Sequence, residues 1–79
     1  MSDTIETVQS LDLTGLACPL PIVNVSKAMK KLNPGDVIEA LTSDPGALTD
    51  FPAWAKTSGN KIVDTISEGN NTRFIIRKN

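Results

Sequence analysis

The chain of 79 residues contains one cysteine, no histidine and no tyrosine. A single cysteine excludes an internal disulfide, a Cys-x-x-Cys redox pair and a multi-cysteine zinc or iron–sulfur site within one chain. Because histidine is the usual general base, its absence excludes Cys–His and Ser–His–Asp catalytic units inside one subunit. Any covalent chemistry must therefore rest on Cys18, on carboxylates, on lysines or on backbone groups.

The chain also lacks an excess of charge and any long apolar run. Eight Lys and Arg residues oppose nine Asp and Glu residues, so the basic excess typical of nucleic-acid binders is missing. No apolar run approaches the roughly 20 residues of a membrane span, and residues 1–9 lack the apolar centre of a signal peptide. An unpaired thiol without an export signal fits a reducing compartment. We therefore expect a cytoplasmic monomer with no cofactor, no metal, no direct nucleic-acid partner and no membrane association.

The length accommodates one small domain. We expect a flexible N-terminus over residues 1–8 and a single domain over residues 9–79. Apolar positions alternate between the two-residue period of strands and the 3.6-residue period of helices. They predict strands at about residues 8–13, 37–42, 61–68 and 72–78, and helices at residues 19–32 and 44–57. This βαβαββ order predicts an α/β fold, a two-layer sandwich with two helices on one face of a mixed four-stranded sheet.

The same periods predict which side chains are buried. Asp44-Pro45 is typical of a helix start, and Pro52 should kink that helix or divide it into two pieces. On the strand at 37–42, Val37 and Leu41 share the face of a glutamate, where they are either covered or scattered surface apolar residues. The residues expected to form the core are Leu11, Leu13, Ile22, Val25, Met29, Leu32, Ile38, Ala40, Leu48, Phe51, Ala55, Phe74 and Ile76.

The segment Cys18-Pro19-Leu20-Pro21 is the most informative for chemistry. Pro19 fits the first helical position and Pro21 the first turn, where neither proline removes an intrahelical hydrogen bond. Cys18 would then cap the helix, close to the N–H groups of Leu20 and Ile22 and to the positive end of the helix dipole. Both favour the thiolate and lower the pKa of a cysteine. The alternative is that Cys18 is a small buried hydrophobe, as free cysteines often are.

Short motifs extend along nearly the whole chain: Leu11-Asp12, Gly15-Leu16, Cys18-Pro19-Leu20-Pro21, Pro34-Gly35-Asp36, Ser43-Asp44-Pro45-Gly46, Asp50-Phe51-Pro52-Ala53-Trp54 and Phe74-Ile75-Ile76-Arg77-Lys78. Together they resemble the TusA/SirA-like sulfur carrier family, from Leu11 onward. The resemblance implies the same βαβαββ sandwich that the apolar pattern predicts independently.

The resemblance implies that Cys18 accepts sulfur as a persulfide from a donor protein, a cysteine desulfurase or a rhodanese-type sulfurtransferase. The sulfur would then pass to an acceptor protein, DsrE-like or similar. Family pathways are tRNA thiolation, molybdenum-cofactor biosynthesis and cytoplasmic sulfur oxidation. Pro19 and Pro21 would position the sulfur. Some relatives have a second cysteine where this chain has Ala55, so a two-cysteine mechanism within one chain is excluded.

The surroundings of the motif supply candidates for partner docking, namely Leu20, Lys27 and Lys31. Leu20 is either a docking contact beside the sulfur or a single surface apolar residue. Lys27, Lys30 and Lys31 form either a partner-facing basic stripe or the solvated side of an amphipathic helix. Trp54 belongs either to the core or to its rim.

Two other function classes compete with a sulfur carrier. One is a non-catalytic regulatory or RNA-associated interaction module, which the near-neutral charge and the sparse aromatic residues disfavour. The other is a cysteine-dependent enzyme acting on thiosulfate or another small sulfur compound. Without histidine or a second cysteine, that enzyme would need residues from a partner.

Overall fold

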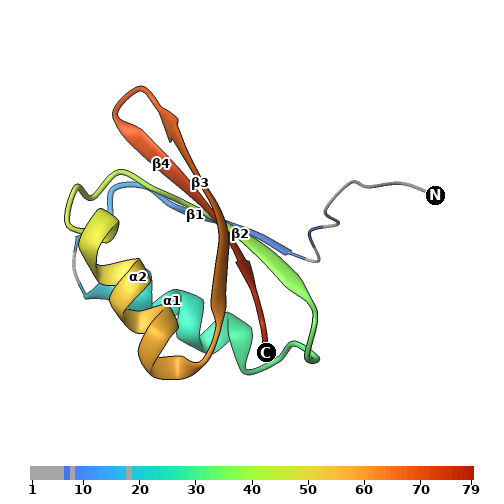
Figure 1. Ribbon diagram of the computed structural model, residues 1–79. Helices are drawn as coiled ribbons and strands as arrows, with labels where there is room; N and C mark the ends of the chain where they lie inside the picture. Colours follow the sequence, from blue (N-terminus) through green and yellow to red (C-terminus); the bar gives the residue numbers. More distant parts are fainter. Residues whose placement is uncertain (1–6, 8, 18) are drawn as a thin grey trace.

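The computed structural model describes residue 7, residues 9–17 and residues 19–79. Six elements follow one another in these segments (Figure 1): β1 Gln9–Leu13, α1 Leu20–Met29, β2 Val37–Thr42, α2 Ala47–Ser58, β3 Lys61–Glu68 and β4 Asn71–Arg77. The βαβαββ order and the strand positions predicted from the sequence are confirmed. The expectation of a flexible N-terminus falls largely on residues 1–6 and 8, which lie outside the described residues.

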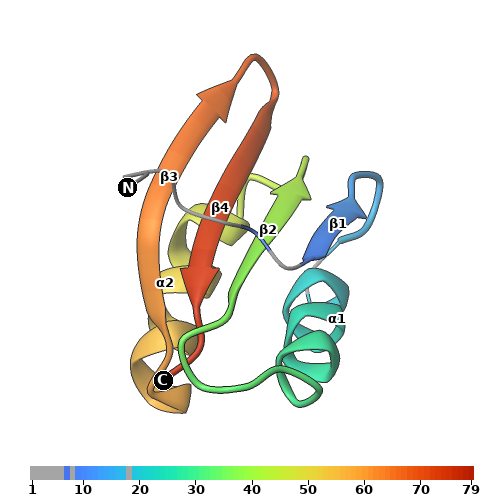
Figure 2. The same ribbon diagram turned by 90° about the vertical axis from the view of Figure 1, so that its right-hand side faces the viewer.

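The four strands form one mixed sheet in the order β1-β2-β4-β3. β1 and β2 are parallel, whereas β4 pairs antiparallel with both β2 and β3. Both helices lie on the same face of this sheet and run side by side (Figures 1 and 2). The predicted two-layer α/β sandwich is therefore confirmed. Because β1 and β2 are parallel, the loops that enter α1 and α2 leave the sheet at the same edge.

The core lies between the helices and the inner face of the sheet. Phe51 of α2 stacks on Phe74 of β4, with ring centroids 4.4 Å apart. Around this pair, the side chains of Val25, Ile38 and Ile76 are fully buried. Removing such apolar surface from water contributes about 1.5–3 kcal/mol for each large side chain. This packing holds both helices in fixed positions on the sheet.

Helix α1 buries the face that the sequence predicts, but it is shorter than predicted. Val25 and Met29 are buried, and Ile22 and Leu32 pack against the core. The regular helix ends at Met29 rather than at Leu32. The carbonyls of Met29 and Leu32 both accept hydrogen bonds from Lys78 Nζ at 2.7 Å. A cation at the C-terminal end of a helix is favourable because it opposes the helix dipole.

Helix α2 differs from the sequence expectation in two respects. It begins at Ala47, because the 44–46 segment is a turn in which Asp44 Oδ1 accepts the Gly46 N–H at 3.2 Å. Ala47 therefore occupies the buried position of the first turn, and Leu48, predicted in the core, is 55% exposed. Pro52 lies inside one continuous helix, so the predicted division into two pieces is wrong.

The outer face of the sheet carries an ionic cluster. The Arg73 guanidinium donates to Glu39 on β2, and its Nε and Nη2 atoms donate to the two Glu68 carboxylate oxygens at 2.8 and 2.9 Å. The hydrogen bond from Arg73 holds the pKa of Glu68 below its ordinary value.

On the same face of the sheet, Val37 is only 8% exposed and Leu41 is half-buried. Val37 is therefore covered by its neighbours rather than being a free surface apolar residue.

No helix in the described part of the chain is long and apolar enough to cross a lipid bilayer.

Candidate functional site

The loop between β1 and α1 is fixed by hydrogen bonds before it reaches the cysteine motif. The Thr14 hydroxyl and the Thr14 N–H both donate to Asp12 Oδ1, at 2.6 and 3.1 Å. These bonds lower the pKa of the Asp12 carboxyl. Gly15 has a φ of 83°, in the left-handed region that favours glycine, and its N–H donates to Ser43 Oγ at 2.9 Å. This bond joins the loop to the segment that follows β2.

The residues on either side of Cys18 form the start of α1. Cys18 itself lies outside the described residues, so its predicted exposure and its pKa stay predictions. The Leu20 N–H donates to the Ala17 carbonyl at 2.9 Å, which closes a turn across the motif. The Val23 N–H donates to the Pro19 carbonyl at 3.0 Å and makes the first helical hydrogen bond.

These hydrogen bonds correct two details predicted from the sequence. Pro19 is the N-terminal cap of α1, with φ −97° and ψ 12°, and the helix begins one residue later, at Leu20. The physical reason is the turn closed by Ala17 and Leu20, which keeps Pro19 out of the helical conformation. The Leu20 N–H, expected to face the sulfur, is instead bonded to the Ala17 carbonyl.

The two prolines of the motif have different environments. Pro21 is fully buried in the first turn of α1, where a missing N–H costs no helical hydrogen bond. Pro19 and Ala17 are exposed. Pro21 therefore attaches the motif to the core, while the residues that flank Cys18 on both sides are accessible to solvent.

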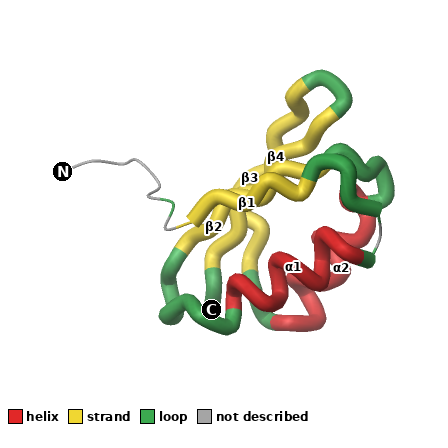
Figure 3. The backbone as a smooth tube through the Cα atoms, turned by 180° about the vertical axis from the view of Figure 1, so that it is seen from behind, coloured by secondary structure: helices red, strands yellow, loops and turns green. Residues whose placement is uncertain are grey.

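Both helices begin at the same end of the sheet (Figure 3), and three exposed apolar side chains come from their first turns. Leu20 and Val23 of α1 are 49% and 39% exposed, and Leu48 in the first turn of α2 is 55% exposed. We call these three residues the motif-edge apolar surface. Sequence reasoning identified Leu20 but placed Leu48 in the core.

The predicted basic residues of α1 are at the surface. Lys27, Lys30 and Lys31 are all exposed, as expected for the side of the helix that faces away from the sheet. Lys27 lies in the last turn of α1, and Lys31 lies in the turn that follows it. Exposure fits both the solvated-face interpretation and the docking interpretation, so docking by Lys27 and Lys31 stays a prediction.

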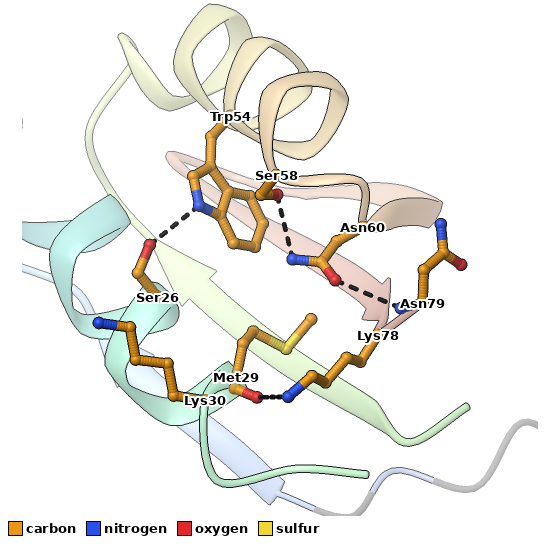
Figure 4. Close-up of a pocket in the computed structure, with 8 residues that line it drawn as sticks. All are labelled: Ser26, Met29, Lys30, Trp54, Ser58, Asn60, Lys78 and Asn79. Atoms are coloured by element: carbon orange, nitrogen blue, oxygen red, sulfur yellow. Dashed lines mark hydrogen bonds between the residues drawn. The ribbon is translucent and has the colours of Figure 1, made fainter. Parts of the chain in front are cut away.

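A pocket of about 230 Å³ lies between the second halves of α1 and α2 (Figure 4). Trp54 of α2, half-buried at the rim of the core, donates from its indole Nε1 to Ser26 Oγ of α1 at 2.9 Å. Met29, Lys30 and Lys78 also line the pocket. Sequence reasoning missed it, because Ser26 and Trp54 are 28 residues apart and no local pattern connects them.

Comparisons with known proteins match nearly the whole described domain. The model of the family described as sulfurtransferase TusA matches residues 9–78. The sulfur carrier protein TusA of Allochromatium vinosum is 40% identical over 70 residues, which cover 89% of this chain and 92% of that protein. A candidate sulfur carrier of Bacillus subtilis is 46% identical over 68 residues, which cover 86% of this chain but only 37% of that protein.

The crystal structure of a SirA-like protein from Desulfitobacterium hafniense has the same fold. The TM-score is 0.78 at 19% sequence identity, and the match covers 89% of this chain and 96% of that one. Fold, motif and similarity thus define a small α/β sulfur carrier domain. The chain belongs to the TusA family, which confirms the resemblance read from its motifs.

Proposed function

We propose that the protein carries sulfur as a persulfide on Cys18, taking it from a donor protein and passing it to an acceptor protein. The observation that carries this proposal is membership of the TusA family together with an intact Cys-Pro-x-Pro motif. The accessible flanks of the motif, Ala17 and Pro19, support it because a partner must reach the sulfur. Buried Pro21 would hold this presenting segment on the domain.

The transfer needs neither a histidine nor a second cysteine in this chain. The Cys18 thiolate attacks the terminal sulfur of a donor persulfide, as in thiol–disulfide exchange. A sulfur–sulfur bond forms at Cys18 while the donor's own sulfur–sulfur bond breaks, and the donor cysteine leaves as a thiolate. The proton on the terminal sulfur stays there, and nothing is oxidised or reduced overall. Delivery to an acceptor thiolate is the same exchange, with this protein as the donor.

Partner docking would use the edge that carries the motif. Leu20, Val23 and Leu48 offer apolar surface there. Lys27, in the last turn of α1, and Lys31, just after the helix, would add positive charge. We expect donors and acceptors to bind this surface in turn, since both must reach the same sulfur. A cysteine desulfurase or a rhodanese-type enzyme is the proposed donor class, and a DsrE-like or similar protein the proposed acceptor class.

The placement in a cell follows from the same chemistry. A persulfide carrier needs a reduced thiol before loading, so a reducing compartment such as the cytoplasm fits the proposed role. The family pathways are tRNA thiolation, molybdenum-cofactor biosynthesis and sulfur oxidation. In each, we propose that this chain would work as a monomer through protein partners and without contacting nucleic acid itself.

Loading by purified donors tests the proposal. The reduced protein is incubated with a cysteine desulfurase and cysteine, and separately with a rhodanese and thiosulfate, and its intact mass is measured. We expect a gain of one sulfur atom that dithiothreitol removes. Cys18→Ala should show no gain with either donor, while Ser10→Ala, at an exposed position of β1, should load normally. Absence of loading with both donors would contradict the proposal.

Cellular function separates a carrier from an interaction module. If the chain acts only as a regulatory or RNA-associated module, Cys18→Ala should preserve its function in cells. If it carries sulfur, Cys18→Ala should abolish that function while the protein stays folded and abundant. Turnover of thiosulfate by the isolated protein would instead indicate a self-sufficient enzyme.

A further inference from the structure

The pocket between α1 and α2 lies away from the motif. Ser26 and Met29 come from the second half of α1 and Lys30 caps its C-terminal end, whereas the motif enters the first turn. At about 1.5 Å per residue, Lys30 lies roughly 15 Å along α1 from Leu20. The volume of about 230 Å³ falls below the roughly 300–1,000 Å³ of small-molecule sites. It suits a single side chain better than a cofactor.

Three polar side chains that line the pocket, Ser26, Lys30 and Lys78, keep hydrogen-bond donors for a ligand. Ser26 Oγ accepts the Trp54 N–H at 2.9 Å, so its own hydroxyl proton remains for a ligand oxygen. Lys78 Nζ uses two of its three N–H donors on main-chain carbonyls at 2.7 Å and retains the third. The exposed Lys30 side chain adds N–H donors that make no hydrogen bond to a described residue. A ligand that binds these three groups accepts hydrogen bonds from them.

The charged side chains that line the pocket have one sign. Lys30 and Lys78 line it, and no aspartate or glutamate side chain among the described residues does so. Exposed Lys27 and Lys31 extend this positive region along the surface beyond the pocket, although the whole chain has a net charge of −1. The indole of Trp54 and the buried side chain of Met29 add apolar surface (Figure 4). An aliphatic stem that ends in a carboxylate fits all of these features.

We propose that this pocket anchors an acidic segment of a partner protein by taking up one carboxylate-bearing side chain. The carboxylate lies at Lys30 and the Ser26 hydroxyl, the stem packs on Trp54, and neighbouring acidic residues face Lys27 and Lys31. This rests on the proposed function only in requiring a protein partner. A partner held here, at a distance from the motif, leaves the approach to Cys18 open.

A peptide titration followed by the emission of Trp54 tests the pocket, because Trp54 is the only tryptophan of the chain. The probe is a short acetylated and amidated peptide of alternating glutamate and glycine, and its glutamine analogue is the matched control. The Cys18→Ala protein is used without any sulfur donor, so failure here is distinct from failure of sulfur loading. We expect a saturable change with the glutamate peptide and none with the analogue.

Matched variants assign the binding to the pocket. Lys30→Glu reverses one charge and should weaken binding about tenfold or more, and Lys30→Gln should weaken it less. Lys61→Glu, an equal charge change on exposed β3, should leave binding unchanged. Equal affinity of Lys30→Glu and Lys61→Glu would overturn the proposal, as would no saturable response below about 1 mM. Equally tight binding of free glutarate would indicate a small carboxylate ligand and overturn the protein partner.

Discussion

Replacing Lys78 by methionine tests how the first helix is attached to the sheet. The Lys78 ammonium, just beyond β4, donates to the carbonyls of Met29 and Leu32 at 2.7 Å each. Hydrogen bonds to charged groups contribute about 1.5–3 kcal/mol each when buried. Here the side chain is half-buried and water can replace the lost donors, so we take about 1 kcal/mol for each bond. Methionine keeps the apolar stem, which limits the loss to the ammonium group.

The expected loss is therefore about 2 kcal/mol in the free energy of unfolding, for a domain whose total lies near 4–12 kcal/mol. In a thermal melt this corresponds to a Tm lowered by roughly 8–16 °C. Urea unfolding followed by circular dichroism gives the free energy independently. Lys61→Met is the control, because exposed Lys61 makes no side-chain hydrogen bond to a described residue. A change below about 0.5 kcal/mol for Lys78→Met, or equal changes in both variants, would mean that the two Lys78 hydrogen bonds do not stabilise the fold.

Three further predictions follow from the docking edge, the outer sheet face and the core. Leu20 is 49% exposed, so burying that exposed half against a donor enzyme contributes about 1 kcal/mol. Leu20→Ala should therefore raise the donor enzyme's KM for this protein about fivefold. Ile66→Ala, on the outer sheet face, should leave this KM unchanged. Because Arg73 lowers the pKa of Glu68 in the folded state, the stabilisation it gives is present above the ordinary value of 4.5 and is lost as the pH falls through the lower folded pKa. In Glu68→Gln, the free energy of unfolding should not show this loss at acid pH. If the unfolding free energies of Glu68→Gln and the unaltered protein depend on pH in the same way, the Arg73–Glu68 pair does not stabilise the fold. Phe51→Ala removes the stacked core ring and should cost about 3–5 kcal/mol, so an unchanged Tm would contradict its place in the core.

The fold could be predicted because apolar spacing in this chain follows the packing closely. Val25 and Met29 recur at helical spacing, and both are buried. Leu11 and Leu13 alternate with polar residues, and both reach the core. The error at Leu48 arose at a boundary: the turn at 44–46 delays α2, so Ala47 takes the buried position. A small residue such as alanine gives little signal for burial, whereas leucine gives a strong one.

The candidate site could be predicted only as far as local sequence determines it. The prolines around Cys18 mark a helix start, and α1 begins within two residues of it. Local sequence did not reveal that the Leu20 N–H is taken by the Ala17 carbonyl, because the choice between a turn and a helix depends on how the whole loop is held. The α1–α2 pocket depends on a contact between distant Ser26 and Trp54, which only the packing of the two helices creates.

Locating the sulfur on protein purified from living cells decides whether Cys18 carries it there. The protein is purified without reductant from cells supplied with a sulfur source, alkylated at once and digested, and the peptide containing Cys18 is analysed by tandem mass spectrometry. We predict a fraction of this peptide with one additional sulfur between Cys18 and the alkyl group, removed by dithiothreitol before alkylation. Detection of only the singly alkylated thiol, under conditions in which a known persulfide protein from the same cells is seen loaded, would mean that Cys18 is not a sulfur carrier.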